Sequence, residues 1–221
     1  QNIGAYGVEV AEFIETVEAY NRHTGQVKRL PNSACAFGYR DSRFKRERDE
    51  WVITAVEFRL SANRALKMNY AGVPEELAAM GVEIPKAVHL AEAISRIRSR
   101  KLPDPALIGN AGSFFKNPVL PEMPEAQAAD LKAQYPELPV FPSGQAGYSK
   151  LSAAWLIEQA GWKGYRQGDA GISAQHALVL VNHGNASGQE LLQVARQVVA
   201  SVKDKFGITL EPEPRILGAD F

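Results

Sequence analysis

The chain has 221 residues, of which 45% are hydrophobic and 23% charged, which is enough apolar material for a packed core. Its 25 basic residues are balanced by 25 acidic ones, so the sequence carries no basic footprint for a nucleic acid, and we expect none as a partner. No apolar run approaches the ~20 residues that cross a bilayer and no signal peptide is visible, so we expect a cytoplasmic protein with no membrane partner.

Cysteine and histidine usage narrows the kinds of site further. Cys35 is the single cysteine, which excludes an intramolecular disulfide and a cysteine-built zinc site; we expect it to be a small buried hydrophobe. The four histidines show no ligand spacing, so we expect no metal.

The first hundred residues alternate between strand and helix patterns. Strands are predicted by β-branched and aromatic residues, and helices by apolar residues at a spacing of three and four. In chain order we expect a hairpin at 8–30 with its turn at 22–26, a charged loop at 43–50, a strand at 51–60, and helices at 74–79 and 85–98.

A proline-rich connector at 101–105 predicts a domain boundary, and the pattern beyond it alternates again. Ser187 followed by Glu190 predicts a capping box, and Gly207 predicts the end of the same long helix. After the connector we expect helices at 126–134, 151–160 and 187–206, a buried strand at 177–182, and a last strand at 208–210 that delivers Glu211 and Glu213. The predicted class is α+β, in two lobes.

The most informative stretch is GNAGSFFKNP at 109–118, where glycines lead into Ser113 and two aromatics follow. Glycines permit close backbone approach, and the aromatics can anchor the segment in a core or wall off a pocket, so we expect Ser113 in a loop that can be held rigidly. Alone this is a weak signal, because turns favour both glycine and serine. It is not a nucleophile elbow either, and no histidine is obviously paired with Ser113, so a serine hydrolase is not expected.

Four further segments accompany that stretch in a characteristic order: QNIGAYG at 1–7, FGYRDS at 37–42, KLPDP at 101–105 and LEPEPR at 210–215. Together the five resemble the UDP-N-acetylenolpyruvoylglucosamine reductase (MurB) family over essentially the whole chain. The resemblance implies the C-terminal part of a mixed α+β FAD-binding domain (1–101), an α+β substrate-binding domain (102–214) and a tail (215–221).

Members of that family begin with glycine-rich loops that cradle the flavin pyrophosphate, whereas this sequence starts on the last flavin-proximal motif, with Gln1. We therefore expect a fragment that binds FAD weakly, is inactive alone and has the missing flavin-binding segment as a partner.

The resemblance implies reduction of FAD by NADPH, then hydride transfer to UDP-N-acetylglucosamine enolpyruvate. Such chemistry needs a positioned acid and preorganised positive charge. Ser113 matches the proton donor, Arg40 the active-site arginine and Glu213 the catalytic glutamate. The alternatives are a plain loop serine, an Arg40 paired with Asp41, and exposed acids between prolines or a swap of roles with Glu211.

Binding residues follow from the same resemblance. Tyr70 matches a tyrosine that covers the nucleotide-sugar, Lys101 a lysine on the diphosphate, and Asn117 an asparagine that contacts substrate. Arg98 could add charge, or be an ordinary solvated helix end. His176 stands where related sequences often have glutamine, so a structural hydrogen bond is an equal alternative.

The flavin contacts are implied by residues near the start of the chain and by two later ones. The matching positions are Asn2, Gly4, Ala5, Tyr6, Gly7, Tyr39 and Ile53.

Two other functions remain open at this point. The chain could be a redox-inactive module that binds a UDP-sugar, or one half of a split reductase whose flavin part is a separate polypeptide.

Overall fold

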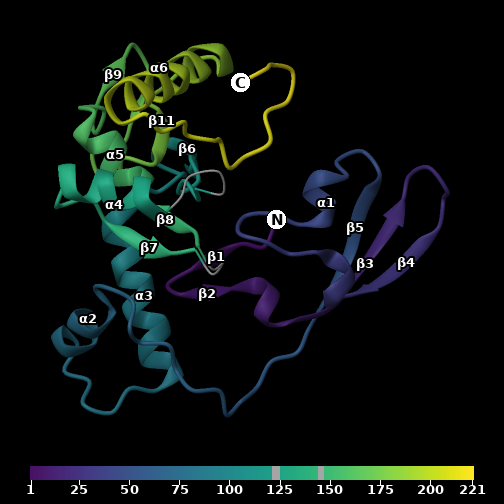
Figure 1. Ribbon diagram of the computed structural model, residues 1–221. Coiled ribbons are helices and arrows are strands. Elements are labelled where there is room, and N and C mark those ends of the chain that lie inside the picture. Colours follow the sequence, from purple (N-terminus) through teal and green to yellow (C-terminus); the bar gives the residue numbers. More distant parts are fainter. Residues whose placement is uncertain (121–124, 144–146) are drawn as a thin grey trace. The chain divides into compact units, whose positions relative to one another are not determined.

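The computed structural model describes residues 1–120, 125–143 and 147–221, with 125–129 described by their backbone alone (Figure 1). The chain divides into two compact units, Gln1–Ile97 and Arg98–Phe221. The division falls four residues before the domain boundary that we placed after Lys101. Each unit is described by itself.

The first unit contains a three-stranded antiparallel sheet in the order β4-β3-β5, formed by β3 (Ile14–Asn21), β4 (Val27–Pro31) and β5 (Trp51–Phe58). The predicted hairpin is confirmed, although its first strand begins at Ile14 and not at Val8, and the predicted strand is confirmed with its end at Phe58 and not at Leu60. The hairpin turns because the Asn21 side-chain oxygen accepts hydrogen bonds from the backbone N–H groups of His23 and Thr24, at 3.0 and 2.9 Å. Cys35 is fully buried, as predicted, and burial raises the pKa of its thiol.

Short elements flank that sheet and were not predicted: β1 (Gly4–Ala5) and β2 (Val8–Glu9), which pair as a hairpin, and the 3-10 turns η1 (Val10–Glu12) and η2 (Asn32–Cys35). The expectation of a loop at 43–50 is wrong in part. Residues Arg43–Arg46 form the one-turn helix α1, because the Ser42 hydroxyl caps it by accepting from the Lys45 N–H.

Two helices follow: α2 (Val73–Ala79) lies in the first unit, and α3 (Ala87–Lys101) begins there and has its last four residues in the second unit. They pack through a small buried cluster of Val73, Leu77, Ala93 and Ile97. Both helices were predicted, but α3 runs three residues past the expected end at Arg98. Lys101 is therefore the last helical residue and not part of the connector, since the first proline that interrupts the pattern is Pro103.

The second unit is built on a four-stranded antiparallel sheet in the order β6-β11-β10-β9. Its strands are β6 (Gly109–Ser113), β9 (Arg166–Gln167), β10 (Ala170–Ile172) and β11 (Val179–Asn182). Only β11 was predicted, two residues longer than observed. The others are short or rich in glycine, so they carry no alternating pattern. Gly171 is required in β10, because a Cβ there would lie 2.6 Å from the Tyr165 carbonyl oxygen.

Helices α4 (Glu125–Gln134), α5 (Ala153–Gln159) and α6 (Gly188–Phe206) accompany this sheet, and all three were predicted. Helix α6 contacts β10, β11 and α5, and it carries the largest run of buried apolar residues (Figure 1). Its capping box of Ser187 and Glu190 is confirmed, as is the left-handed Gly207 at its end. The core of the unit lies between α5, α6 and the sheet.

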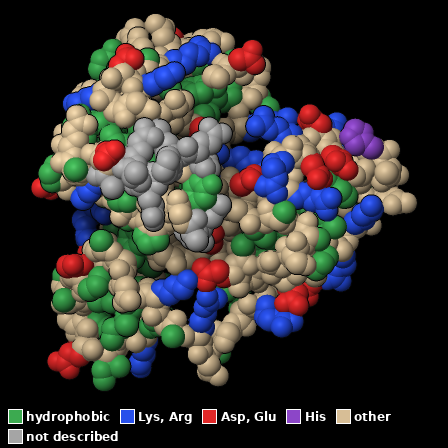
Figure 2. Space-filling view, viewed as in Figure 1, with side chains coloured by type: hydrophobic (Ala, Val, Ile, Leu, Met, Phe, Trp, Pro, Cys, Tyr) green, Lys and Arg blue, Asp and Glu red, His purple; other side chains and the backbone are tan. Residues whose placement is uncertain are grey.

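The expected strand at 208–210 is wrong: Ile208 and Leu210 are buried, but the segment pairs with no strand among the described residues. A further hairpin, β7 (Val140–Pro142) with β8 (Ser149–Leu151), was not predicted. On the face shown in Figure 2, acidic and basic side chains are interspersed. Among the described residues, no helix combines the length and apolar character needed to cross a bilayer.

Candidate functional site

Ser113 is the last residue of β6, so the predicted loop is in fact a strand end. Ser113 pairs with Val179 of β11, and Gly112 before it has a φ of +74°, a conformation that favours glycine. The Asn110 side chain fixes this bend by accepting from the Gly112 N–H at 3.0 Å and donating to the Ile108 carbonyl at 2.9 Å. Among the residues that the structure describes, the Ser113 hydroxyl has no hydrogen-bond partner.

The two aromatics after Ser113 are buried in the core, which is the first of the two roles that we weighed for them. Phe115 is 1% exposed and Phe114 is buried as well, and their rings meet edge to face with centroids 5.0 Å apart. The Phe114 N–H also donates to the Leu178 carbonyl at 2.7 Å. The backbone at Ser113 therefore cannot move unless Phe114 and Phe115 leave their places in the core.

The segment that carries Glu213 pairs with the segment after Ser113. Phe115 and Pro212 form an antiparallel bridge. On either side of it, the Glu213 N–H donates to the Phe114 carbonyl at 2.7 Å and the Lys116 N–H donates to the Glu211 carbonyl at 3.0 Å. This pairing brings two of the three predicted catalytic residues together, although they are a hundred positions apart in the sequence.

The same pairing separates the two acids of the LEPEPR segment. The Glu211 side chain is 72% exposed and forms an ion pair with Lys116 at 3.1 Å, whereas Glu213 is half-buried. The neighbouring Lys116 therefore pairs with the carboxylate of Glu211.

A cavity of about 710 Å³ lies beside this strand end, within the second unit. Its lining runs from the end of α3 through residues 102–112 to Gln175 and Val179, and it includes the predicted binding residue Arg98. Lys101 lies one helical turn from Arg98, on the same side of α3.

Burial lowers the pKa of the His176 imidazole, and the positive charge of Lys101 lowers it further. Its Nδ1 accepts a hydrogen bond from the Leu178 N–H at 3.3 Å. Nδ1 therefore carries no proton, and the neutral ring carries its proton on Nε2. The structural hydrogen bond that we weighed for His176 is present.

Asn117 is committed in part to the fold. Its side-chain oxygen accepts from the Ala153 N–H at 2.9 Å, which satisfies the first free backbone donor of α5.

In the first unit, Arg40 adopts a left-handed backbone with φ of 53°, and its guanidinium donates to the Gly4 carbonyl. It also lies over the Tyr39 ring, 5.2 Å from the centroid. The alternative partner Asp41 is instead bound by Arg46. Arg40 and Tyr39 are thus joined to the β1–β2 hairpin that carries the predicted flavin residues.

Three of the predicted site residues, Asn2, Tyr6 and Arg40, have positive φ without being glycine. Such backbone costs about 1–3 kcal/mol per residue and concentrates at functional sites. Gly7 extends the turn with a φ of +76° and, like Ala5, is exposed.

Asn2 is buried, and its amide holds the hairpin from within. It donates to Glu9 at 2.7 Å and to the Gly38 carbonyl at 2.8 Å, and accepts from the Ala11 N–H at 3.0 Å. The side chain therefore acts inside the protein, and a flavin contact of Asn2 would use its backbone.

The remaining predicted residues of this unit lie on different elements. Tyr70 precedes α2, and its ring meets that of Tyr6 with centroids 4.9 Å apart. Ile53 lies on β5, an edge strand, and is 45% exposed.

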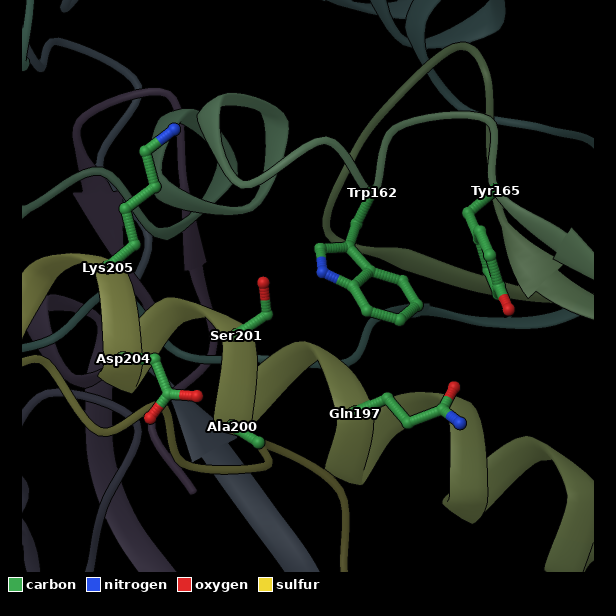
Figure 3. A pocket seen from close by; sticks show the side chains of 7 residues that line it. All are labelled: Trp162, Tyr165, Gln197, Ala200, Ser201, Asp204 and Lys205. Atoms are coloured by element: carbon green, nitrogen blue, oxygen red, sulfur yellow. The ribbon is translucent and has the colours of Figure 1, made fainter.

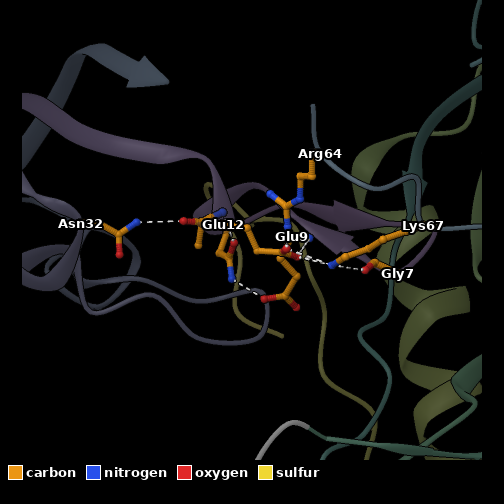
Figure 4. Close-up of polar contacts among 8 residues, drawn as sticks. Gly7, Glu9, Glu12, Asn32, Arg64 and Lys67 are labelled. Carbon is orange, nitrogen blue, oxygen red and sulfur yellow. Dashed lines mark hydrogen bonds and ion pairs between the residues drawn. The ribbon is translucent and has the colours of Figure 1, made fainter. Parts of the chain in front are cut away.

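One charged cluster escaped the sequence analysis. Glu12 binds both Arg64 and Lys67, as Figure 4 shows. The acidic pair Glu9 and Glu12, at the spacing of a capping box, was the available signal. Among the described residues, no group of three histidine, cysteine or acidic side chains is placed to hold a metal.

A second large cavity, of about 700 Å³, lies on α6 between the aromatic pair Trp162 and Tyr165 and the side chains of Gln197, Ser201 and Asp204 (Figure 3). None of these residues belongs to the predicted site. The cavity beside Ser113, and not this one, is therefore the candidate site of the second unit.

Comparison with known proteins agrees with the resemblance. The family model described as UDP-N-acetylenolpyruvoylglucosamine reductase, C-terminal domain, matches residues 104–217, just over half of the chain. The chain belongs to this reductase family. The residues that the family model matches include both segments of the pairing between 114–116 and 211–213.

Similar curated proteins carry the same name. UDP-N-acetylenolpyruvoylglucosamine reductase of Xanthomonas euvesicatoria pv. vesicatoria is 56% identical over 219 residues, covering 99% of this chain and 62% of that protein. The protein of that name from Xylella fastidiosa is 55% identical, covering 100% and 62%. The chain thus spans about three fifths of the length of these relatives.

A solved structure supports the α+β class. The crystal structure of UDP-N-acetylenolpyruvylglucosamine reductase (MurB) from Thermus caldophilus matches with a TM-score of 0.56 at 26% identity, covering 96% of this chain and 56% of that one.

Proposed function

We propose that this chain provides the substrate-binding and proton-donating part of a UDP-N-acetylmuramate dehydrogenase, which reduces UDP-N-acetylglucosamine enolpyruvate for peptidoglycan synthesis in the cytoplasm. The observation that carries the proposal is the pairing of residues 114–116 with 211–213, which sets Glu213 beside the strand end that bears the Ser113 hydroxyl.

FAD, reduced by NADPH, would supply the hydride to the enolpyruvyl double bond. The adjacent carbon then carries negative charge shared with the carboxylate, and it must receive a proton. A serine hydroxyl is a weak acid, but an enolate is a strong base, so Ser113 can give up its proton to that carbon. Its hydroxyl is available because no described residue occupies it.

Glu213 and Arg40 would interact with the negatively charged carboxylate of the substrate. Glu213 would act as a carboxyl hydrogen-bond donor to the substrate carboxylate. Arg40 is permanently charged and can bind a carboxylate through two N–H groups. It is held rigidly by the Gly4 carbonyl and the Tyr39 ring, so little entropy is lost when a ligand binds.

The nucleotide-sugar would bind through Tyr70, Lys101, Arg98, Asn117 and His176. The two cations lie one turn apart on α3, which suits a diphosphate. His176 can donate from Nε2, because its Nδ1 is already bound to the Leu178 N–H. A donor is what a phosphate requires, and so the histidine can fill the place of a glutamine amide.

The first unit fits one wall of a flavin site. The exposed backbone of Ala5 and Gly7, with Arg40 and Tyr39 against the same hairpin, suits the approach of a flat ring. The pyrophosphate would need a loop of backbone donors, which the residues assigned to the flavin do not form among the described parts of the chain. We therefore expect weak FAD affinity of this chain; submicromolar binding in a titration would contradict that expectation.

Ser113→Ala in an enzyme complete with its flavin tests the proposal. Reduction of the flavin by NADPH should continue at the wild-type rate, whereas reduction of the UDP-sugar should fall by about 10³-fold, the scale of a general acid. Stopped-flow absorbance of the flavin separates the two half-reactions. An equal loss in both would show that Ser113 has a structural role only.

A second candidate, one half of a split reductase, is favoured by β5. Its apolar side chains Val52, Ile53, Val56 and Phe58 are 38–49% exposed on an edge strand, which is a surface that a further polypeptide could cover. Concentration-dependent association, with FAD affinity restored by a flavin-binding segment supplied in trans, would support it. Calorimetry with the UDP-sugar distinguishes both from a redox-inactive binding module, which would bind the sugar equally well with and without that segment.

A further inference from the structure

Tyr70 lies in a long stretch without regular secondary structure. Strand β5 ends at Phe58 and α2 begins at Val73, and residues 59–72 between them form no helix or strand. At its start, the Arg59 N–H donates to the Phe13 carbonyl at 2.7 Å. At its end, the Val73 N–H donates to the Tyr70 carbonyl at 3.0 Å and closes a turn before α2. A segment with so few backbone hydrogen bonds opens easily unless side chains hold it.

The Glu12 carboxylate holds the middle of this stretch (Figure 4). It accepts from Lys67 Nζ at 3.0 and 2.9 Å and from the Arg64 guanidinium, and it also accepts from the Glu9 N–H at 3.1 Å. Lys67 in turn donates to the Gly7 carbonyl at 3.1 Å. One carboxylate therefore joins two cations of the stretch to the β1–β2 hairpin and to η1.

Aromatic rings make further contacts with the same stretch. The Arg64 guanidinium lies over the Phe13 ring, 4.3 Å from its centroid. Three residues beyond Lys67, the Tyr70 ring meets Tyr6 of the hairpin at 4.9 Å. Tyr6 and Met68 both pack against the buried cluster of α2 and α3.

We propose that Glu12 is a positioning residue: by binding Arg64 and Lys67 together it fixes the stretch before α2, and so holds Tyr70 against Tyr6 in the place where it would receive the nucleotide-sugar. The second half of this inference rests on the proposed role of Tyr70. The first half, that Glu12 orders the stretch, depends on the contacts alone.

The strength of the cluster suits a releasable attachment. The side chains of Glu12, Arg64 and Lys67 are 31%, 38% and 44% exposed, so each ion pair is partly screened by water. The hydrogen bonds from Lys67, together with the other contacts, lower the pKa of Glu12 to about 2, so the carboxylate stays charged near neutral pH.

Glu12→Gln in the full chain is the decisive variant. Glutamine at this position of a capping box can still accept from the Glu9 N–H, so η1 is kept and only the charge is lost. Glu57→Gln is the matched control, because Glu57 binds Arg29 and Thr16 in the same unit, and neither Arg64 nor Lys67 is among its partners.

The first readout is tryptic cleavage after Arg64 and Lys67 under native conditions, followed by mass spectrometry. Loss of about 1 kcal/mol of attachment should speed both cleavages about fivefold in Glu12→Gln, whereas Glu57→Gln should match the wild type. Equal rates in all three proteins would overturn the proposal.

The second readout is calorimetric binding of UDP to the same proteins. We expect UDP to bind Glu12→Gln about fivefold more weakly than it binds the wild type or Glu57→Gln, and Lys67→Arg, which keeps the charge, to restore most of the loss relative to Lys67→Met. Faster cleavage with unchanged UDP affinity would overturn the positioning of Tyr70. If the wild type binds no UDP, the proposed function fails, while the cleavage rates still decide whether Glu12 orders the stretch.

Discussion

Ser113 and Glu213 in the second unit are placed by backbone pairing over a large core, whereas Arg40, Tyr6 and Tyr70 in the first unit are placed by side-chain contacts and left-handed backbone. The bridge between Phe115 and Pro212 has buried aromatic and aliphatic residues behind it. The hairpin that meets Arg40 depends instead on the amide of Asn2 and the charge of Glu12.

The difference teaches where each unit is vulnerable. A residue fixed by packing and strand pairing moves only when the core moves. A residue fixed by a few polar contacts can move while the rest of the unit stays folded, which suits residues that close on a ligand.

Phe115→Ala should break the second unit and has the largest expected effect. Phe115 is 1% exposed, so its loss leaves a cavity and should lower the free energy of unfolding by about 4 kcal/mol, measured by urea denaturation. Phe141→Ala removes a ring that is 43% exposed and should change the same quantity by about 0.5 kcal/mol. Similar losses in both variants would mean that the ring of Phe115 does not carry the core behind Ser113.

Asn2→Ala should loosen the first unit by a smaller amount. It leaves Gly38, Ala11 and Glu9 without the buried amide that pairs with them, and it puts alanine at a φ of 55°. We expect about 2 kcal/mol less stability by thermal or urea unfolding.

The control for Asn2→Ala is Asn185→Ala, since the backbone N–H of Asn185, which an alanine retains, binds Asp169. A loss at Asn2 no larger than at Asn185 would contradict the account of the hairpin.

His176→Gln should change how the stability of the second unit depends on pH. The folded-state pKa of His176 lies below its usual 6.5, so the unfolded chain takes up the proton first, and stability is lost as pH falls below 6.5. Glutamine does not titrate, so this part of the loss is absent in the variant. As the pH is lowered from 8 to 5, the melting temperature of the variant should therefore fall less than that of the wild type. A gap between the two melting temperatures that is constant over that range would contradict the buried, neutral histidine.

In the first unit, Glu12 makes stability depend on pH in a more acidic range. Because the pKa of Glu12 is lowered from 4.5 to about 2, its stabilising contribution is complete above pH 4.5 and is lost as pH falls through about 2.

Gln197→Met should have the smallest effect, and a stabilising one. The Gln197 side-chain oxygen is buried without a hydrogen-bond partner among the described residues, so an apolar side chain of similar shape should raise the free energy of unfolding by roughly 0.5–1 kcal/mol. Gln193→Met, on an exposed turn of the same helix, should leave it unchanged. A loss at position 197 would show that the oxygen has a partner in solution, such as an ordered water.

Much of the local structure could be predicted from the sequence. The capping box at Ser187 and Glu190, the left-handed Gly207 and the helices α2 and α5 follow from side chains and spacings that act within one turn. Strand β5 likewise follows from its β-branched and aromatic residues. In each case, residues close in sequence carry the physical cause.

The sequence by itself determined the family resemblance, the α+β class and the residue types that the proposed chemistry needs. Only the tertiary structure decided that 208–210 forms no strand with the described parts of the chain, that Ser113 ends a strand, and that Lys116 forms an ion pair with Glu211. It also decided that Glu12 serves two cations more than fifty residues away. These outcomes depend on which segments distant in sequence exchange hydrogen bonds and charges, and no pattern within a single segment encodes that choice.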